Sequence, residues 1–228
     1  MDHYNMNKSS HNSYGFTLVE IMIALAISGI ITGAVYSAYI VQQRTYLAQE
    51  QVAEMQQNIR AGLDMMARDI RSAGFDPNNL GAGISVADTD NVVFTREDDL
   101  SADGLETIAY SLFDAYMSTT PPSNDGLVDD LALQTTTAAG TSGGRQAVAE
   151  NFQAIEFRYL DTNGVVTATL ADIRSIQVSI LAVASRPDQN FTNTMTYTTG
   201  SGAVWGPYND NLRRRMLITT IQCRNLGL

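Results

Sequence analysis

Residues 15–20 read Gly-Phe-Thr-Leu-Val-Glu, and the 21 residues that follow, IMIALAISGIITGAVYSAYIV (21–41), contain no charged side chain. About 20 apolar residues form a helix of about 30 Å, which is long enough to cross the hydrocarbon core of a bilayer. Glu20 lies inside this apolar segment, where an unpaired carboxylate costs on the order of 3 kcal/mol. The stretch therefore predicts a membrane helix whose single carboxylate needs a partner.

A cleaved secretory signal peptide is the ordinary alternative for such a stretch. The apolar run is longer than the usual apolar region of a signal peptide, and the leader is barely basic, because Asp2 balances Lys8. A cut between Gly15 and Phe16 would instead create an α-amino group one helical turn from Glu20. That amino group could neutralise the carboxylate in the same chain or in a neighbouring parallel helix.

These residues resemble the class III signal peptide of type IV pilins and of type II secretion pseudopilins. The resemblance implies that prepilin peptidase cuts between Gly15 and Phe16 and methylates Phe16, and that Glu20 is the assembly carboxylate. It also implies a subunit held in the bacterial inner membrane by one helix, with an extracytoplasmic head, that later joins a pilus at the cell surface. The leader is less basic than most in the family, and the helix lacks the proline common in major pilins.

Gly29 and Gly33 form a G-x-x-x-G pattern in the apolar helix. This spacing permits close approach of two helices in an apolar setting and predicts a helix-packing site. Glycine is also common in membrane helices in general, so both interpretations stay open.

Residues 42–74 carry four acidic and four basic side chains and continue the helix as an amphipathic segment. Apolar residues recur there at spacings of three and four, which predicts one buried stripe: Val52, Met55, Ile59, Leu63, Met66, Ile70 and Ala73. Gly74 and the Asp76-Pro77 pair predict its end. We expect one helix over 16–74, about 88 Å long, whose stripe packs on a sheet.

Residues 75–228 change to the alternation typical of strands and form the expected head. We expect strands over 92–95, 108–112, 131–134, 154–160, 173–183 and 217–223, and loops over 118–126, 135–146 and 186–211. The predicted fold class is α+β and pilin-like, with the amphipathic helix packed on one sheet. The predicted organisation is a cleaved leader (1–15), a transmembrane and filament-core helix (16–41), its amphipathic continuation (42–74) and the head (75–228).

The segment from Arg60-Ala61-Gly62-Leu63 to Gly74-Phe75-Asp76-Pro77 and the ending from Arg213 to Asn225 are similar to PilW-type minor pilins. The resemblance implies a minor pilin that acts in assembly initiation or at the tip of a type IV pilus. Its implied partners are prepilin peptidase, other minor and major pilins and the inner-membrane assembly platform. A J-like minor pseudopilin of a type II secretion system is the alternative, because those proteins share much of the pattern.

Rare residues limit the chemistry of the processed chain. Both histidines, His3 and His11, and the lone lysine, Lys8, lie in the leader. The processed chain therefore cannot form a Ser-His or Cys-His nucleophile, a Schiff-base lysine or a histidine metal site. We expect no enzyme; the rival from another class is a membrane-tethered enzyme that uses paired carboxylates alone.

The net charge and the spacing of acidic residues bear on two further candidate ligands, nucleic acid and calcium. With 14 basic and 24 acidic residues the net charge is −10, which disfavours nucleic acid as a partner. Asp99, Ser101 and Asp103 resemble the start of a calcium loop, but Tyr110 stands where the closing glutamate belongs. A solvated acidic loop is therefore the alternative, and no cofactor is firmly predicted.

Two features near the end of the chain have a plain structural interpretation and a functional alternative. Arg213–Arg215 is interpreted as a solvated strand entrance that pairs with nearby acids, with an acidic partner surface or DNA as the alternative. Cys223, the only cysteine, falls on the apolar phase of its strand and predicts a buried thiol. An intermolecular disulfide is the alternative for this residue.

Overall fold

The computed structural model describes residues 15–97, 104–113 and 130–227. The chain divides into an N-terminal unit, Met1–Leu47, and a C-terminal unit, Ala48–Leu228, and each is described by itself. Helix α1 runs from Leu18 to Ser72 and contributes to both units. The α+β class with a long N-terminal helix is confirmed.

Helix α1 is shorter by two residues at each end than the expected helix over 16–74. Ser72 is its last residue, and Gly74 follows with a φ of 77°, the left-handed conformation that glycine adopts without steric cost. The Gly74 N–H donates to the carbonyl of Thr95 at 3.0 Å, which joins the exit of the helix to a strand of the head.

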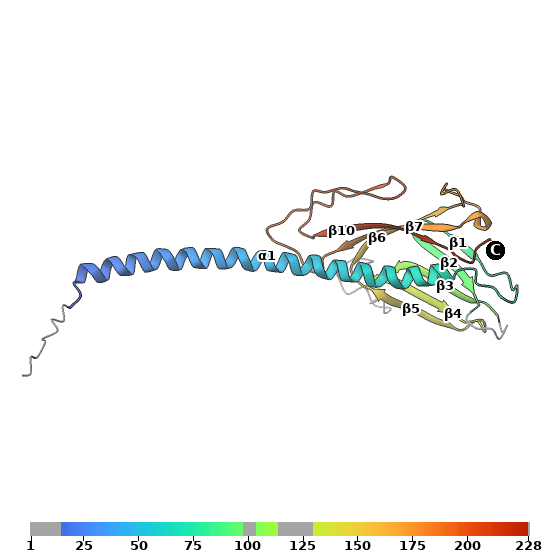
Figure 1. The fold of residues 1–228 in the computed structure, drawn as a ribbon, viewed down its shortest axis with the longest axis horizontal. Coiled ribbons are helices and arrows are strands. Elements are labelled where there is room, and N and C mark those ends of the chain that lie inside the picture. Colours follow the sequence, from blue (N-terminus) through green and yellow to red (C-terminus); the bar gives the residue numbers. More distant parts are fainter. Residues whose placement is uncertain (1–14, 98–103, 114–129, 228) are drawn as a thin grey trace, which may run out of the picture. The chain divides into compact units, whose positions relative to one another are not determined.

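Five antiparallel strands form the larger sheet in the order β1-β2-β3-β4-β5 (Figure 1). Their bounds are Ile84–Ala87 (β1), Asn91–Arg96 (β2), Glu106–Phe113 (β3), Asp130–Thr136 (β4) and Ser142–Ala149 (β5). Each strand pairs with the next along the chain, so short connections suffice. The expected strands 92–95, 108–112 and 131–134 lie within β2, β3 and β4.

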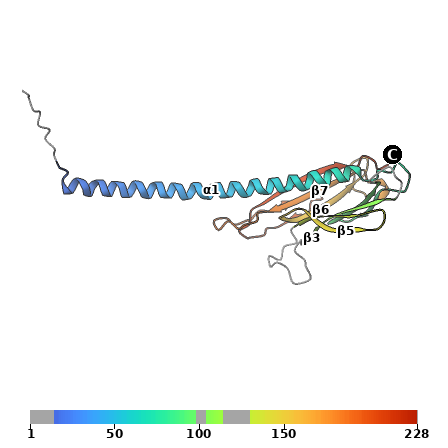
Figure 2. The ribbon, with the colours of Figure 1, turned by 90° about the horizontal axis from the view of Figure 1, so that it is seen from below.

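Three antiparallel strands form the second sheet in the order β10-β7-β6. Their bounds are Phe152–Leu160 (β6), Ser175–Val183 (β7) and Arg214–Gln222 (β10), and the short helix η1 covers Leu170–Asp172. A two-stranded ribbon, Tyr197–Thr198 (β8) and Val204–Trp205 (β9), stands in the connection from β7 to β10. The second part of α1 runs alongside the strands of the C-terminal unit in Figure 2.

Three expectations were wrong. The head contains two larger sheets and a ribbon, not one sheet. The expected loop 135–146 contains the end of β4 and the first half of β5, and the expected loop 186–211 contains β8 and β9. Strand β1 was not predicted. The expected loop 118–126 lies outside the described residues.

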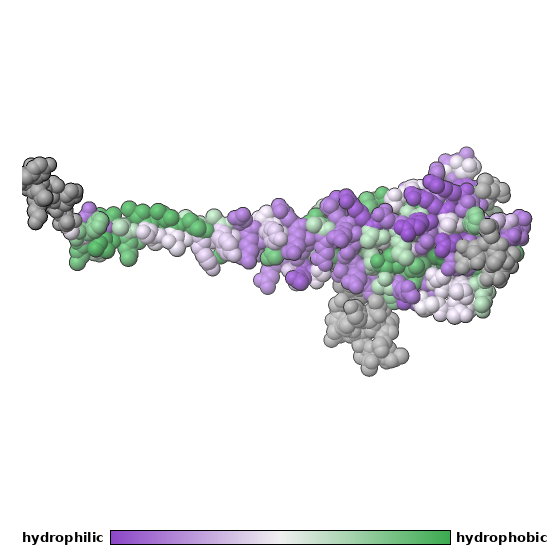
Figure 3. Space-filling model, turned by 60° about the horizontal axis from the view of Figure 1, so that its bottom comes forward, coloured by the Kyte–Doolittle hydropathy of each residue, from purple (hydrophilic) through white to green (hydrophobic). Residues whose placement is uncertain are grey.

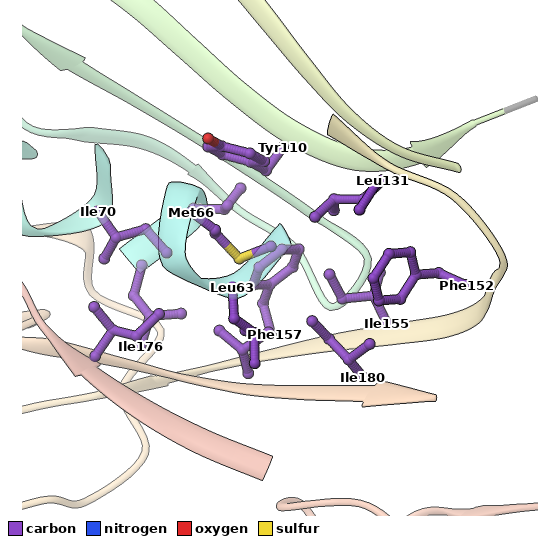
Figure 4. Close-up of a cluster of buried hydrophobic side chains, with 14 of the residues drawn as sticks. Leu63, Met66, Ile70, Tyr110, Leu131, Phe152, Ile155, Phe157, Ile176 and Ile180 are labelled. Atoms are coloured by element: carbon purple, nitrogen blue, oxygen red, sulfur yellow. The ribbon is translucent and has the colours of Figure 1, made fainter. Parts of the chain in front are cut away.

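The predicted apolar stripe of α1 is buried and forms the centre of the core. Six of its seven residues are buried, namely Met55, Ile59, Leu63, Met66, Ile70 and Ala73, and Val52 is half-buried against them. The side chains of Met66 and Ile70 lie among those of Tyr110 from β3 and Ile176 from β7 (Figure 4). Both sheets therefore bury their apolar faces on one helix, which satisfies the layer arrangement that the class requires.

Gly62 allows α1 to approach the larger sheet closely. A Cβ atom at this position would lie 3.0 Å from Leu131 Cδ2 and 3.2 Å from the Ala149 Cβ. A side chain here would push the helix away from β4 and β5.

A polar cluster joins the end of α1 to strands β2 and β3. The Tyr110 hydroxyl donates to Asp69 Oδ2 at 2.6 Å. Arg96 donates through Nη1 to the Ser72 hydroxyl at 2.8 Å and through Nε to Glu106 at 2.9 Å. Because the bonds to Asp69 and Ser72 cross from helix to sheet, they fix the position of α1 along the strands.

Candidate functional site

The start of α1 contains a reciprocal side-chain cap. Glu20 Oε2 accepts the Thr17 N–H at 3.2 Å and the Thr17 hydroxyl at 3.1 Å. The Glu20 N–H in turn donates to Thr17 Oγ1 at 3.2 Å. This is the capping box that a T-x-x-E sequence forms at a helix N-terminus, where the carboxylate also meets the positive end of the helix dipole. The residues Thr17-Leu18-Val19-Glu20 carry the sequence signal for this cap, which was not among the predictions.

The predicted processing residues stand just before this cap. Gly15 and Phe16 are exposed, and the Phe16 side chain is 83% accessible. Oε1 of Glu20 has no hydrogen-bond partner among the described residues. One carboxylate oxygen is thus held by the chain itself, and the other is available to a cation. Cleavage between Gly15 and Phe16 stays a prediction.

Residues 21–41 of α1 carry no charged side chain, and residues 18–47 are exposed almost throughout. Figure 3 shows hydrophobic side chains along the first part of the helix on the face in view. By length and composition this helix can cross a membrane. Its hydroxyl groups bond to carbonyls one turn back: Thr32 to Ser28 at 2.8 Å and Ser37 to Gly33 at 2.9 Å. These internal bonds remove the cost of placing the hydroxyls in an apolar environment.

Gly29 and Gly33 lie on this exposed part of α1. A Cβ atom at either position would meet no atom within 4 Å. The glycines therefore serve no packing purpose among the described residues of a single chain, and a helix-packing role stays a prediction.

The calcium candidates Asp99, Ser101 and Asp103 lie outside the described residues. Among the residues that the structure describes, no three His, Cys, Asp or Glu side chains gather in a way that could hold a metal ion. Cys223 is buried, and burial raises the pKa of its thiol to about 12. A thiol with so high a pKa is protonated and unreactive at neutral pH, so the prediction of a buried thiol is confirmed.

Arg213 and Arg214 close the long connection between β7 and β10. Arg213 Nη2 lies 2.7 Å from Asp188 Oδ2, and its guanidinium stacks on the Phe191 ring. Arg214 donates to both carboxylate oxygens of Asp210 at 2.6 Å. We call these four side chains, Arg213, Asp188, Arg214 and Asp210, the arginine clasp. The pairing with nearby acids is confirmed for these two arginines, and the Arg215 side chain is exposed.

Two buried glutamates in the head are held by hydrogen-bond donors. Glu97 accepts the N–H and the side-chain amide of Asn78 at 3.0 and 2.8 Å. Glu156 accepts the hydroxyls of Thr199 and Ser201 at 2.9 and 2.8 Å. These bonds satisfy the buried carboxylates and fasten the segments that carry the donors to the head.

Comparison with known proteins agrees with this arrangement. Residues 10–36 match the prokaryotic N-terminal methylation motif, and residues 122–225 match the family Type IV Pilus-assembly protein W. A type IV-like pilin from Thermus thermophilus has a similar fold, with a TM-score of 0.51 and 13% identity over 76% of this chain and 98% of that chain. No curated protein sequence matches the chain.

Proposed function

We propose that this chain functions as a minor pilin, because residues 10–36 match the N-terminal methylation motif and residues 122–225 match the PilW family. Prepilin peptidase removes residues 1–15 and methylates Phe16. The first part of α1 holds the subunit in the bacterial inner membrane with its head on the extracytoplasmic side. The subunit then enters a type IV pilus, where it acts in assembly initiation or at the tip.

One observation carries this proposal: a single chain joins the methylation motif on an exposed apolar helix to a PilW match that covers much of the head. The PilW match supports a pilus over the alternative, a J-like minor pseudopilin of a type II secretion system. It also supports, as partners, other minor and major pilins and the inner-membrane assembly platform.

Glu20 is proposed as the carboxylate that guides assembly. Its Oε2 is occupied by Thr17, and its Oε1 is open. The α-amino group of a processed Phe16 is a cation near a helix N-terminus, where an unpaired positive charge is unfavourable. Pairing the Phe16 amino group of one subunit with the Glu20 carboxylate of its neighbour would neutralise both charges inside an apolar filament core.

No catalytic activity and no cofactor are part of this proposal. The pilin fold is a structural one, and the processed chain has neither histidine nor lysine. A carboxylate-dependent enzyme would need two carboxylates free to act, whereas Glu97 and Glu156 are held by donors. Calcium binding by Asp99, Ser101 and Asp103 stays a prediction.

The experiment replaces the chain in its own cells with Glu20→Ala or with Glu50→Ala, an exposed carboxylate farther along the same helix. We expect both variants to be processed and membrane-inserted, and sheared pili to contain the wild type and Glu50→Ala but not Glu20→Ala. Cells that lack the chain should lose most pili. Normal piliation with defective protein secretion in those cells would favour the secretion pseudopilin and overturn the proposal.

A further inference from the structure

A cavity of about 500 Å³ opens in the head between the two sheets. Its walls come from the start of β2, the end of β3, the middle of β5, the edge of β6 and strand β9 of the ribbon. This volume falls in the range of small-molecule sites. The cavity lies far along the chain from the N-terminal unit, and nothing in the proposed filament role uses it.

Two of the polar residues on the cavity wall, Asp90 and Arg145, are exposed, and a third, Asn91, is half-buried. Asp90, Asn91 and Arg145 line the cavity, and their side chains make no hydrogen bond or ion pair in the part of the chain that the structure describes. Arg96 and Arg214, by contrast, each hold an acidic side chain. Unused donors and acceptors that face one cavity are the groups that orient a ligand.

Gln153 adds a fixed amide to the same wall. Its Oε1 accepts a hydrogen bond from Arg214 Nε, so the orientation of the amide is set by the arginine clasp. The amide NH₂ group then remains as a donor with no partner among the described residues. The site thus combines donors from an amide and a guanidinium with acceptors from a carboxylate.

Trp205, the only tryptophan of the chain, completes the wall. It lies on β9 and is half-buried. The ribbon that carries it is fastened to the smaller sheet, since Gly200 N–H donates to Ser179 Oγ at 2.9 Å and Thr199 donates to Glu156. A fixed aromatic ring offers a binding surface that costs little conformational entropy to use.

We propose that this cavity binds a saccharide that carries a carboxylate, such as a uronic acid. The C–H face of a sugar ring is positively polarised and packs on the negative face of an indole ring. Asp90 and Asn91 accept and donate hydrogen bonds to ring hydroxyls. The Arg145 guanidinium binds the sugar carboxylate through paired N–H donors.

The charges of the protein argue against a site for a bare anion. The protein carries a net charge of −10, so long-range attraction of anions is absent, and Asp90 stands on the same wall as Arg145. A ligand must therefore gain from the aromatic face and the hydroxyl contacts as well as from the arginine. A carboxylated sugar makes all three kinds of contact.

The test uses tryptophan fluorescence, because Trp205 is the sole tryptophan and reports on the cavity alone. The full chain, in a detergent without a sugar headgroup, is titrated with D-glucuronate, D-glucose and acetate. We expect glucuronate to change the emission at millimolar concentration, glucose to bind about tenfold more weakly because it lacks the carboxylate, and acetate to have no effect. An equal response to acetate would indicate an anion site and overturn the proposal.

Variants separate the contacts, with binding followed by calorimetry where the tryptophan is changed. Arg145→Gln should lose about tenfold in affinity for glucuronate and leave glucose binding unchanged, since only the carboxylate contact is removed. Trp205→Ala should abolish binding of both sugars, whereas Trp205→Phe keeps an aromatic face and part of the affinity. Arg224→Gln, on a different cavity, is the control and should change nothing.

The proposal is overturned if none of the three probes binds, or if Arg145→Gln and Arg224→Gln have equal effects. The circular dichroism spectrum of each variant shows whether it is folded. Because binding is measured on the isolated chain, a negative result here leaves the proposed minor-pilin function untouched, and failure of the filament experiment leaves this site untouched.

Discussion

Residues 18–41 and 48–72 belong to one helix but differ in what surrounds them. In the first part, apolar side chains point in all directions and stay exposed; Ile30 is 75% accessible. In the second part, apolar side chains follow one stripe and are buried; Ile70 is 0% accessible. The same residue type in the same helix is therefore exposed in one region and is part of the core in the other (Figures 3 and 4).

The difference shows that the periodicity of the apolar residues in a helix indicates what covers it. An apolar stripe is covered by the same chain, and a helix that is apolar all round is covered by lipid or by other chains. A stripe with a period of 3.6 residues can be covered by one sheet on one side, and the head supplies that cover. A helix that is apolar all round needs lipid or other helices on every side. Polar groups follow the same division: Thr32 bonds to its own helix, whereas Asp69 bonds to Tyr110 of the head.

The largest expected effect on stability comes from shortening a side chain of the buried stripe. Ile70→Ala should lower the free energy of unfolding of the C-terminal unit by about 2–5 kcal/mol, because it removes buried methyl groups and leaves a cavity. The matched change Ile30→Ala removes the same atoms from an exposed position. It should leave thermal unfolding of that unit unchanged when the full chain is followed by circular dichroism. Equal losses from the two variants would contradict the comparison.

The polar bonds between helix and head should have the next largest effect. Tyr110→Phe removes the donor to Asp69 and leaves a carboxylate oxygen without it, at a cost of about 1–3 kcal/mol in denaturant unfolding. Tyr208→Phe is the matched control, because the ring still stacks on Arg214 and the Tyr208 hydroxyl makes no hydrogen bond among the described residues. If Tyr110→Phe were as stable as Tyr208→Phe, the hydrogen bond from Tyr110 to Asp69 would contribute nothing to holding the helix on the head.

The comparison also explains which elements could be predicted from the sequence. Helix α1 and its stripe follow from local periodicity, and strands β2, β3, β6, β7 and β10 alternate clearly enough to be expected near their observed positions. Strand β5 contains Gly143 and Gly144, and most of its side chains are exposed, so its composition is typical of a loop. Pairing with β4 makes it a strand, and pairing between distant segments leaves no local signal.

The pairing of strands with one another was the other feature that could not be predicted from the sequence. The division into two sheets depends on which strands pair, so it was not foreseen. Among the site residues, the roles of Gly15, Phe16 and Glu20 are implied by the resemblance of their motif to class III signal peptides and stay predictions. The capping role of Thr17 was available in the T-x-x-E pattern. The acidic partners of Arg213 and Arg214, and the cavity beside Trp205, depend on loops that close only in the folded head.

A smaller effect is expected from the arginine clasp, which belongs to the C-terminal unit alone. Arg214→Gln should raise the rate of chymotrypsin cleavage within 186–211 by about tenfold, the factor that corresponds to about 1.4 kcal/mol. Arg215→Gln removes an exposed neighbour and serves as control. Similar cleavage of both variants would contradict a closing role for the Arg214–Asp210 pair.

The clasp should also depend on pH. The hydrogen bonds from Arg214 hold the pKa of Asp210 below its usual value of 3.8. A carboxyl group with a lowered pKa in the folded state stabilises that state above its unfolded pKa and loses this contribution as the pH falls further. Hydrogen exchange of the Leu212 amide, which donates to Asp210, should therefore be slow above about pH 4 and lose protection at lower pH.

The smallest effect is expected at the start of α1. Thr17→Val removes the cap and should cost about 1 kcal/mol locally, without changing the unfolding of the C-terminal unit. Hydrogen exchange of the Glu20 amide measures this loss, because that amide donates to Thr17 Oγ1. Thr45→Val, whose hydroxyl bonds within the helix to Val41, is the control and should leave the Glu20 amide protected.

In the proposed function, the exposed part of α1 is not cleaved off. Processing removes only residues 1–15 and leaves the amino group of Phe16 free for assembly. Mass spectrometry of the N-terminal peptide from the chain purified out of its own cells tests this most directly. We expect a chain that begins at N-methylated Phe16. A chain that begins after residue 41, or one that keeps residues 1–15 in assembled pili, would contradict it.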